Sequence, residues 1–286
     1  MSQFELAEPK SLSEALSLLD RHDPAVRPIG GGTALMLMMK AQIFKPTRLV
    51  SLRHLGAPFK GLSLSEDGSH LLVGAMTTFS ELEHSPLVQM HHPVVVKTMR
   101  TLANVRVRNV ATVGGNLAHG DPHLDLPPVW MALAAAVRVV SRTGERVIPV
   151  EDIFAGYYET TISDGELIAE LRVPVRPAWR SIYVKVTTRA THDWPALGIA
   201  VSAEFVGMRV QDIRIVLSAA LDKPTRLVAA EQALRGQDLD ERSLARAGDA
   251  AVAEVDIETD SRGSAAYKNH LLRVHLMRAI QSIAGA

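Results

Sequence analysis

Two glycine-rich segments constrain the fold of this chain more than any other feature: residues 30–35 read GGGTAL and residues 112–116 read TVGGN. Each follows a short apolar run and carries a threonine beside its glycines. Glycine lets backbone N–H groups approach a ligand closely and adopt positive φ. A concave set of N–H donors suits a phosphate oxygen, so two such turns could hold the two phosphates of a dinucleotide. The alternative is two ordinary tight turns, because glycine commonly punctuates structure.

The composition excludes several classes of protein. The 286 residues carry 31 basic and 31 acidic side chains, so no overall field attracts nucleic acid or an anionic membrane. The chain has no cysteine, which excludes disulfides, cysteine nucleophiles, cysteine-ligated iron–sulfur clusters and a cysteinyl–flavin bond. Its N-terminus is polar, and its longest apolar stretch, residues 129–137, is too short to span a bilayer. We expect a soluble, cytoplasmic protein.

The first part of the chain mixes helices and strands. A capping box at residues 11–14 predicts a helix that ends near Arg21, and short strands are expected at residues 25–29 and 49–52. Residues 1 to about 55 therefore form a small β-α-β unit in this interpretation. Further elements are expected up to residue 175: strands at 71–75 and 168–173, a helix at 93–102, a loop at 116–128, a helix at 129–135, and a hairpin of 137–141 with 146–150.

The pattern of apolar and polar residues changes after a proline-rich linker at residues 174–177. Three alternating segments predict antiparallel strands at 181–187, 198–205 and 210–219, and helices are expected at 226–234, 239–255 and 265–283. The predicted fold class is α+β, with an N-terminal domain of residues 1–175 (subdomains of about 1–55 and 56–175) and a C-terminal domain of residues 178–286.

The glycine segments do not match the best-known phosphate motifs. Leu35 stands where a Rossmann fingerprint has its third glycine, and neither segment has the Gly-Lys-Ser/Thr of a P-loop. A nicotinamide-binding Rossmann domain and an NTPase are therefore disfavoured. What remains is a different dinucleotide cradle, made of two separated segments that the fold brings together.

Polar residues follow the second segment. His119, Asp121, His123 and Asp125 alternate, as metal ligands would, but Gly120 and Pro122 prevent a regular frame, so we predict no metal site. Asp125 either accepts a ligand hydroxyl or caps the following helix.

Two residues of the C-terminal domain carry similar alternatives. Trp194 is either a core aromatic or a cover for an aromatic cofactor. Lys185 is either a surface charge or a donor to a carbonyl or phosphate oxygen.

Residues 30–35, the RNVATVGGN of residues 108–116 and the DLP of residues 125–127 together resemble the FAD-binding medium subunit of the molybdenum hydroxylases. This family includes bacterial carbon monoxide dehydrogenase, and the same module lies inside xanthine dehydrogenase. The DSRGSAAY of residues 260–267 is similar to the closing helix region of the family. The resemblance implies a two-part FAD domain of the vanillyl-alcohol-oxidase type followed by a smaller flavoprotein C-terminal domain.

The resemblance also implies a set of FAD-binding residues. Asp125 would hold an FAD hydroxyl, Ile168 and Lys185 would lie along the flavin, and Trp194 would cover the isoalloxazine ring. Leu102 matches a position that is aromatic in xanthine dehydrogenase. The residues that would wrap the pyrophosphate are Pro28, Ile29, Gly30, Gly31, Gly32, Thr33, Ala34, Leu35, Thr112, Val113, Gly114, Gly115 and Asn116.

The function implied by the resemblance is that of an oxidoreductase subunit that transfers electrons. Molybdopterin is expected on a large partner subunit and two [2Fe–2S] clusters on a small one, in a dimer of heterotrimers. The first segment reads GGGT where the carbon monoxide enzyme has GGHS, which argues against carbon monoxide as the substrate. The alternatives are a stand-alone flavin oxidase and a non-catalytic assembly or maturation protein with the same fold.

Overall fold

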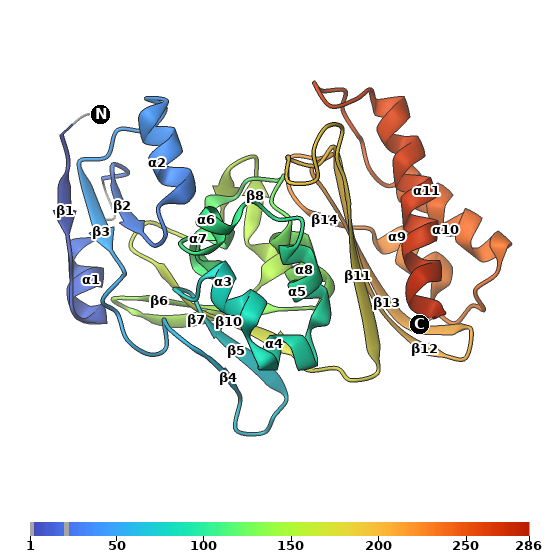
Figure 1. Cartoon of the computed structure of the whole chain (residues 1–286), viewed down its shortest axis with the longest axis horizontal. Coiled ribbons are helices and arrows are strands. Elements are labelled where there is room, and N and C mark those ends of the chain that lie inside the picture. Colours follow the sequence, from blue (N-terminus) through green and yellow to red (C-terminus); the bar gives the residue numbers. More distant parts are fainter. Residues whose placement is uncertain (1–2, 20–22, 286) are drawn as a thin grey trace.

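The structure is a computed structural model that describes residues 3–19 and 23–285. Three sheets follow one another along the long axis of the molecule, and the C-terminal helices cover the last of them (Figure 1). None of the helices in these two ranges is long and apolar enough to cross a membrane.

The N-terminal sheet is parallel and has the strand order β1-β3-β2. The β-α-β unit predicted from the sequence is confirmed, and it gains one further strand at its edge. Ser11 caps the first helix by accepting from the Glu14 N–H at 3.2 Å. The expected end of that helix near Arg21 lies outside the described residues. The elements are β1 (Glu5–Ala7), α1 (Leu12–Leu18), β2 (Val26–Ile29), α2 (Thr33–Lys40) and β3 (Arg48–Ser51).

The central sheet is antiparallel, with the strand order β4-β5-β10-β6-β7. Its strands are β4 (Leu62–Leu64), β5 (His70–Gly74), β6 (Ala136–Ser141), β7 (Gly144–Pro149) and β10 (Leu167–Pro174). A two-stranded sheet, β8 (Phe154–Gly156) with β9 (Glu159–Thr160), follows the 3₁₀ helix η1 (Val150–Asp152). The helices are α3 (Phe79–His84), α4 (Pro86–His91), α5 (Pro93–Met99), α6 (Val105–Arg108), α7 (Val113–His119) and α8 (Leu126–Ala132).

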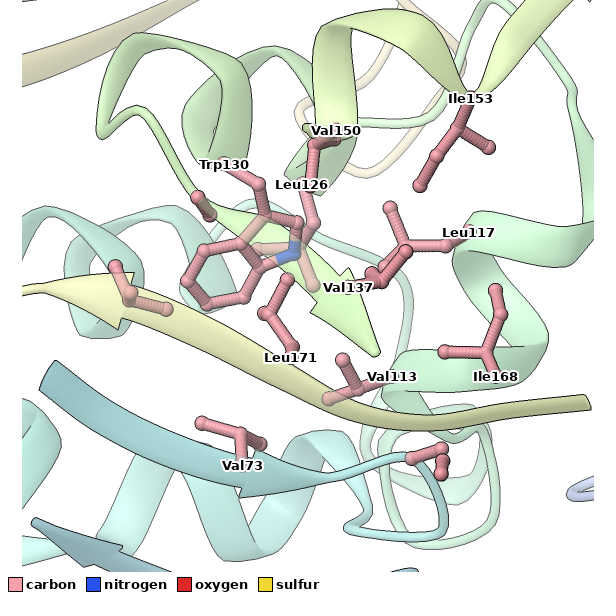
Figure 2. Packing of buried hydrophobic residues seen from close by; sticks show 14 of the residues in the cluster. Val73, Val113, Leu117, Leu126, Trp130, Val137, Val150, Ile153, Ile168 and Leu171 are labelled. Atoms are coloured by element: carbon pink, nitrogen blue, oxygen red, sulfur yellow. The ribbon is translucent and has the colours of Figure 1, made fainter. Parts of the chain in front are cut away.

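Trp130 lies at the centre of the core of this domain. The indole is buried and packs among apolar side chains of α7, α8, β6 and β10, including Leu117, Val137 and Leu171 (Figure 2). Burial of aromatic and aliphatic surface of this kind is the main stabilising contribution to the fold. The core thus fixes α7 and α8, which border the cavity described below.

The C-terminal domain is an antiparallel sheet of order β11-β12-β13-β14, covered by three helices. Successive side chains of β12 point to opposite faces, and both faces are buried. Ile199 and Val201 pack in the core formed with the C-terminal helices, whereas Ala200 belongs to the core around the central sheet. The elements are β11 (Trp179–Val186), β12 (Leu197–Val206), β13 (Arg209–Ser218), β14 (Thr225–Arg226), α9 (Val228–Leu234), α10 (Glu241–Ala253) and α11 (Ala265–Ala284).

His92, between α4 and α5, is expected to make the stability of the fold sensitive to acid. Its side chain is buried, and its Nε2 has no hydrogen-bond partner within the described ranges. Burial lowers the pKa of His92 to about 4, with a smaller contribution from His91. The unfolded chain, with a histidine pKa of about 6.5, binds the proton first, so stability is lost as pH falls from about 6.5 toward about 4.

We therefore expect the unfolding free energy of the wild type to fall between about pH 7 and about pH 5. This fall is expected to be about 2 kcal/mol larger than the fall in His92→Gln. Urea unfolding of both proteins at the two pH values measures this difference. Equal pH dependence in the two proteins would show that His92 is not the titrating group.

Candidate functional site

A cavity of about 1010 Å³ lies between the N-terminal sheet, the central domain and the start of the C-terminal sheet. Both glycine-rich segments line it, together with the loop after α7, residues 158–168, Lys185 and Trp194. Its volume lies at the upper end of the range of about 300–1,000 Å³ that is usual for ligand sites. The cavity therefore suits a large ligand such as a dinucleotide.

Each glycine segment leads into the N-terminus of a helix. Gly32 is the N-cap of α2 and has φ of 68°, which favours glycine. Thr112 is the N-cap of α7, and its Oγ1 accepts from the Gly115 N–H at 3.3 Å. The second segment is thus the first turn of a helix, and the prediction of a glycine turn followed by a loop from residue 116 was wrong there. Helix N-termini present free N–H groups to anions.

The two glycine segments are packed directly against each other. A Cβ atom on Gly31 would lie 1.8 Å from the Val110 carbonyl oxygen, and one on Gly30 would lie 2.7 Å from Thr112 Oγ1. Gly114 faces away from the first segment, since its Cβ would lie 2.6 Å from the Ala75 Cβ. Close packing, against backbone at Gly31 and against side chains at Gly30 and Gly114, leaves no room for a Cβ at these positions, so the segments form one continuous wall.

The cavity brings together almost all of the residues that the resemblance placed at FAD. Val113 is the exception, because its side chain is buried in the core and its N–H donates to the Thr77 carbonyl at 3.0 Å. The expectation that Val113 wraps a ligand is corrected on this ground. The residues that do line the cavity are Pro28, Ile29, Gly30, Gly31, Gly32, Thr33, Ala34, Leu35, Leu102, Thr112, Gly114, Gly115, Asn116, Asp125, Ile168, Lys185 and Trp194.

Asp125 forms a buried polar cluster with two residues of β11. Its Oδ2 lies 2.9 Å from Lys185 Nζ, and its Oδ1 accepts from the Tyr183 hydroxyl at 2.7 Å. Lys185 also donates to the Thr101 carbonyl at 3.0 Å. Burial raises the pKa of Asp125, against the opposing effects of Lys185 and Tyr183. Asp125 stands at the N-cap position of α8, as one alternative had it, but its side chain makes no capping hydrogen bond.

Tyr183 is the residue of this cluster that our sequence analysis missed. Burial raises its pKa well above 10, so the hydroxyl stays protonated and donates to Asp125. One signal was present in the sequence: Tyr183 and Lys185 are two residues apart in a predicted strand and therefore share a face.

Gly198 on β12 makes room for the Tyr183 ring, so its replacement tests the cluster. A Cβ there would lie 2.6 Å from the Tyr183 hydroxyl oxygen and 2.5 Å from Ser218 Oγ. We expect Gly198→Ala to displace Tyr183 from Asp125 and to cost about 1–3 kcal/mol of stability in urea unfolding. Tyr183→Phe in the same background is expected to cost less than the sum of the two single changes. A fully additive pair would contradict this steric account.

The alternating His and Asp residues before α8 hold one another. Asp121 Oδ1 accepts from the His123 N–H at 2.9 Å and lies 3.0 Å from His123 Nδ1, while the Tyr158 hydroxyl donates to Asp121 Oδ2 at 3.1 Å. Burial opposes ionisation of Asp121, but these hydrogen bonds prevail and lower its pKa. Burial lowers the pKa of His119, which keeps it neutral near pH 7. Residues 3–19 and 23–285 contain no cluster of three such side chains that could hold a metal.

Trp194 lies at the cavity with 47% of its surface exposed. The alternative of a core aromatic is therefore wrong. Its ring stacks on His123 with a centroid distance of 5.3 Å and an interplanar angle of 15°. The exposed part of the indole therefore leaves apolar surface at the cavity that another planar group could contact.

Two family models account for nearly the whole chain. A model of the FAD-binding domain in molybdopterin dehydrogenases matches residues 2–176. A model of the C-terminal domain of the carbon monoxide dehydrogenase flavoprotein matches residues 182–283.

Individual proteins are similar over the same length. The carbon monoxide dehydrogenase medium chain of Hydrogenophaga pseudoflava is 31% identical over 280 residues, which cover 98% of this chain and 96% of that one. The nicotine 6-hydroxylase medium subunit of Paenarthrobacter nicotinovorans is 31% identical, with 96% and 95% covered. A solved structure of the H. pseudoflava carbon monoxide dehydrogenase, in a form that lacks the Mo-pyranopterin moiety, matches with a TM-score of 0.94 at 33% identity and covers 99% of this chain and 97% of that one.

Proposed function

Because this chain belongs to the family of FAD-binding medium subunits of the molybdenum hydroxylases, we propose that it is the electron-transfer subunit of a heteromeric molybdopterin-dependent hydroxylase or dehydrogenase. In this proposal, electrons arrive from [2Fe–2S] clusters on a small partner subunit and leave for an external acceptor. Substrate oxidation takes place on a large molybdopterin subunit. The complex is a dimer of heterotrimers in the cytoplasm.

The observation that carries the proposal is the single cavity walled by both glycine segments. It lies in a chain that resembles medium subunits from end to end.

The residues of the cavity fit FAD. Gly30, Gly31 and Gly115 leave a wall without side chains, and the N-terminus of α2 lies at this wall. Asn116 Oδ1 is buried and has no hydrogen-bond partner among the described residues, so it is available to a ligand donor. A pyrophosphate against the glycine wall would satisfy the free N–H groups at the start of α2. The N–H groups in the first turn of α7 already donate within the protein, for example Gly114 to the Ala75 carbonyl at 2.8 Å.

The chain's own contribution is to bind, orient and shield this cofactor. FAD, when bound, supplies the chemistry of accepting and releasing two electrons. Lys185 holds a buried positive charge at the cavity, fixed by Asp125 and the Thr101 carbonyl, and Trp194 offers an apolar face. The described residues of the cavity include no group of three His, Asp or Glu side chains that could hold a metal.

The proposal is tested by purifying the chain together with a large molybdopterin subunit and a small iron–sulfur subunit from the same organism. Chemically reduced small subunit, mixed anaerobically with the FAD-loaded chain, is expected to bleach the flavin absorbance. Bleaching by an organic substrate without any partner would favour a stand-alone oxidase instead. A chain that joins its partners but cannot be loaded with FAD would favour an assembly or maturation protein.

A further inference from the structure

Trp194 is held at the cavity by two side-chain contacts. It lies in the segment between β11 and β12, and nearly half of its surface is exposed. Its backbone N–H donates to Asp193 Oδ1 at 2.8 Å, a bond that leaves the indole free to rotate. Several staggered rotamers are open to a side chain this exposed unless its neighbours select one. The contacts of the ring therefore decide how it meets a ligand.

The first contact is the stack of Trp194 on His123, which joins the two domains. His123 is nine-tenths buried and belongs to the loop of the FAD domain, whereas Trp194 belongs to the C-terminal domain. The Asp121 carboxylate fixes His123 by contacting both the backbone N–H and the Nδ1 of that residue. The Ala219 N–H donates to the Pro122 carbonyl at 3.0 Å, which ties this loop to β13. The imidazole is thus a preorganised platform for the indole.

The second contact comes from Arg262, whose guanidinium carbon lies 5.5 Å from the centroid of the Trp194 ring. This distance is within the range of a cation–π interaction. Arg262 projects from a closed turn, since its own N–H donates to Asp260 Oδ1 at 2.8 Å and the Asp260 N–H donates to the Gly263 carbonyl at 3.1 Å. The buried Lys268 ammonium lies 2.8 Å from Asp260 Oδ2 and anchors that turn to α11.

The geometry points to His123 and Arg262 as positioning residues that set the placement of Trp194 against the isoalloxazine ring of bound FAD. They act through the indole, one from each domain. A change in the relative position of the two domains would therefore move the indole relative to the flavin. This inference rests on the proposed function, because it takes Trp194 as the residue that covers the ring. It assigns a role to two residues that lie outside the glycine cradle.

Flavin fluorescence of the full-length chain loaded with free FAD tests the inference, because an indole in contact with isoalloxazine quenches its emission. We expect Trp194→Phe to brighten the flavin several-fold. His123→Ala and Arg262→Gln are each expected to move emission toward that level. Loss of either contact shifts the equilibrium between the positioned and the unpositioned indole conformers by roughly 2- to 10-fold. His123→Phe is expected to stay near the wild-type emission, because it keeps the stack but loses the Nδ1 contact with Asp121.

The matched control is Arg273→Gln, which removes an exposed arginine of α11 that pairs with Asp249 away from the cavity; it is expected to leave emission unchanged. In a Trp194→Phe background, His123→Ala and Arg262→Gln are expected to add nothing. Wild-type emission in both Arg262→Gln and His123→Ala with FAD retained would overturn the inference, as would a His123→Phe protein as bright as His123→Ala. The measurement needs no partner subunit, so its failure is distinguishable from failure of the chain to accept electrons from a partner.

Discussion

Gly31→Ala is expected to abolish FAD binding and to destabilise the fold by more than about 3 kcal/mol. The added Cβ would lie 1.8 Å from the Val110 carbonyl oxygen and 2.9 Å from the Ala111 Cα, both backbone atoms that cannot rotate away. The two glycine segments would have to separate, and helices α2 and α7, which follow them, would have to move apart as well. FAD titration followed by visible absorbance, together with urea unfolding, measures both effects.

The matched control for this substitution is Gly56→Ala. Gly56 has no heavy atom of the described chain within 4 Å of an added Cβ apart from its own neighbours, and its φ lies outside the left-handed region. We expect this variant to bind FAD as the wild type does. Full FAD retention in Gly31→Ala would show that contact between the segments is not what forms the site.

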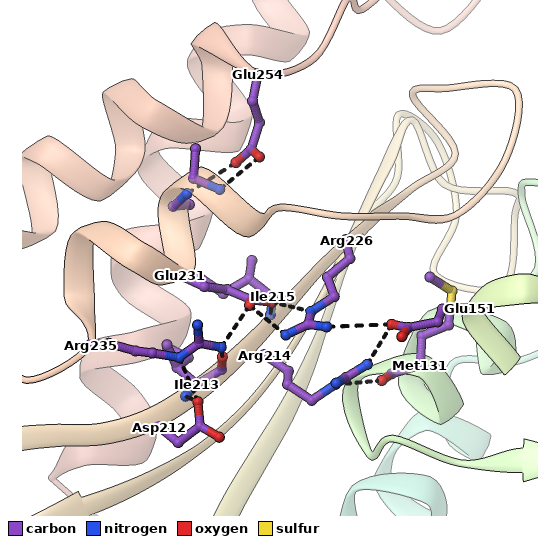
Figure 3. Close-up of polar contacts among 12 residues, drawn as sticks. Met131, Glu151, Asp212, Ile213, Arg214, Ile215, Arg226, Glu231, Arg235 and Glu254 are labelled. Carbon is purple, nitrogen blue, oxygen red and sulfur yellow. Dashed lines mark hydrogen bonds and ion pairs between the residues drawn. The ribbon is translucent and has the colours of Figure 1, made fainter. Parts of the chain in front are cut away.

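Glu231→Ala is expected to destabilise the protein by about 3–5 kcal/mol, because it removes a buried carboxylate and leaves the buried Ile215 N–H and two partly buried arginines without their acceptor. The Glu231 carboxylate is fully buried on α9. Its Oε1 accepts from Arg226 Nε at 2.8 Å and from the Ile215 N–H at 3.0 Å, and its Oε2 accepts from Arg226 Nη2 at 2.8 Å and Arg235 Nη2 at 3.1 Å (Figure 3).

The same network reaches into the FAD domain. Arg226 Nη1 lies 3.6 Å from Glu151 Oε2, and Arg214 donates to Glu151 at 2.6 Å and to the Met131 carbonyl at 3.1 Å (Figure 3). Loss of Glu231 therefore also loosens a contact between the domains. Urea unfolding of the full chain measures the total cost.

Asp249→Ala is the control for this second substitution. Asp249 forms a solvent-exposed ion pair with Arg273 at 2.8 Å, and such pairs contribute about 0–1 kcal/mol. Equal small losses in Glu231→Ala and Asp249→Ala would mean that the buried network does not stabilise the protein as its geometry implies.

The sequence predicted the arrangement of the elements well wherever local signals agreed. The capping box at residues 11–14 does begin a helix, and the three alternating segments after residue 178 do form antiparallel strands. The second glycine segment misled the prediction, because glycine has a low helix propensity. Position 114 requires glycine because α7 packs so closely on Ala75 that a Cβ does not fit, which is a tertiary requirement invisible to local reasoning.

The site could be predicted only through the resemblance, and some of its chemistry not at all. Nothing local shows that Asp125 is bonded by Tyr183 and Lys185, because these residues lie about sixty positions further along the chain. For the same reason the alternation from His119 to Asp125 suggested metal ligands. In the fold, Asp121 and His123 instead hold each other and support Trp194.

The most direct test of the central claim is to titrate the purified chain with FAD and to record its visible spectrum. We predict that each chain binds a single FAD, and that Gly115→Leu loses it at a cost of only about 1–3 kcal/mol in unfolding free energy, because an added Cβ there meets only the Thr112 hydroxyl within 4 Å, at 2.9 Å. A colourless chain that takes up no FAD, or a Gly115→Leu protein that keeps it fully, would contradict the account.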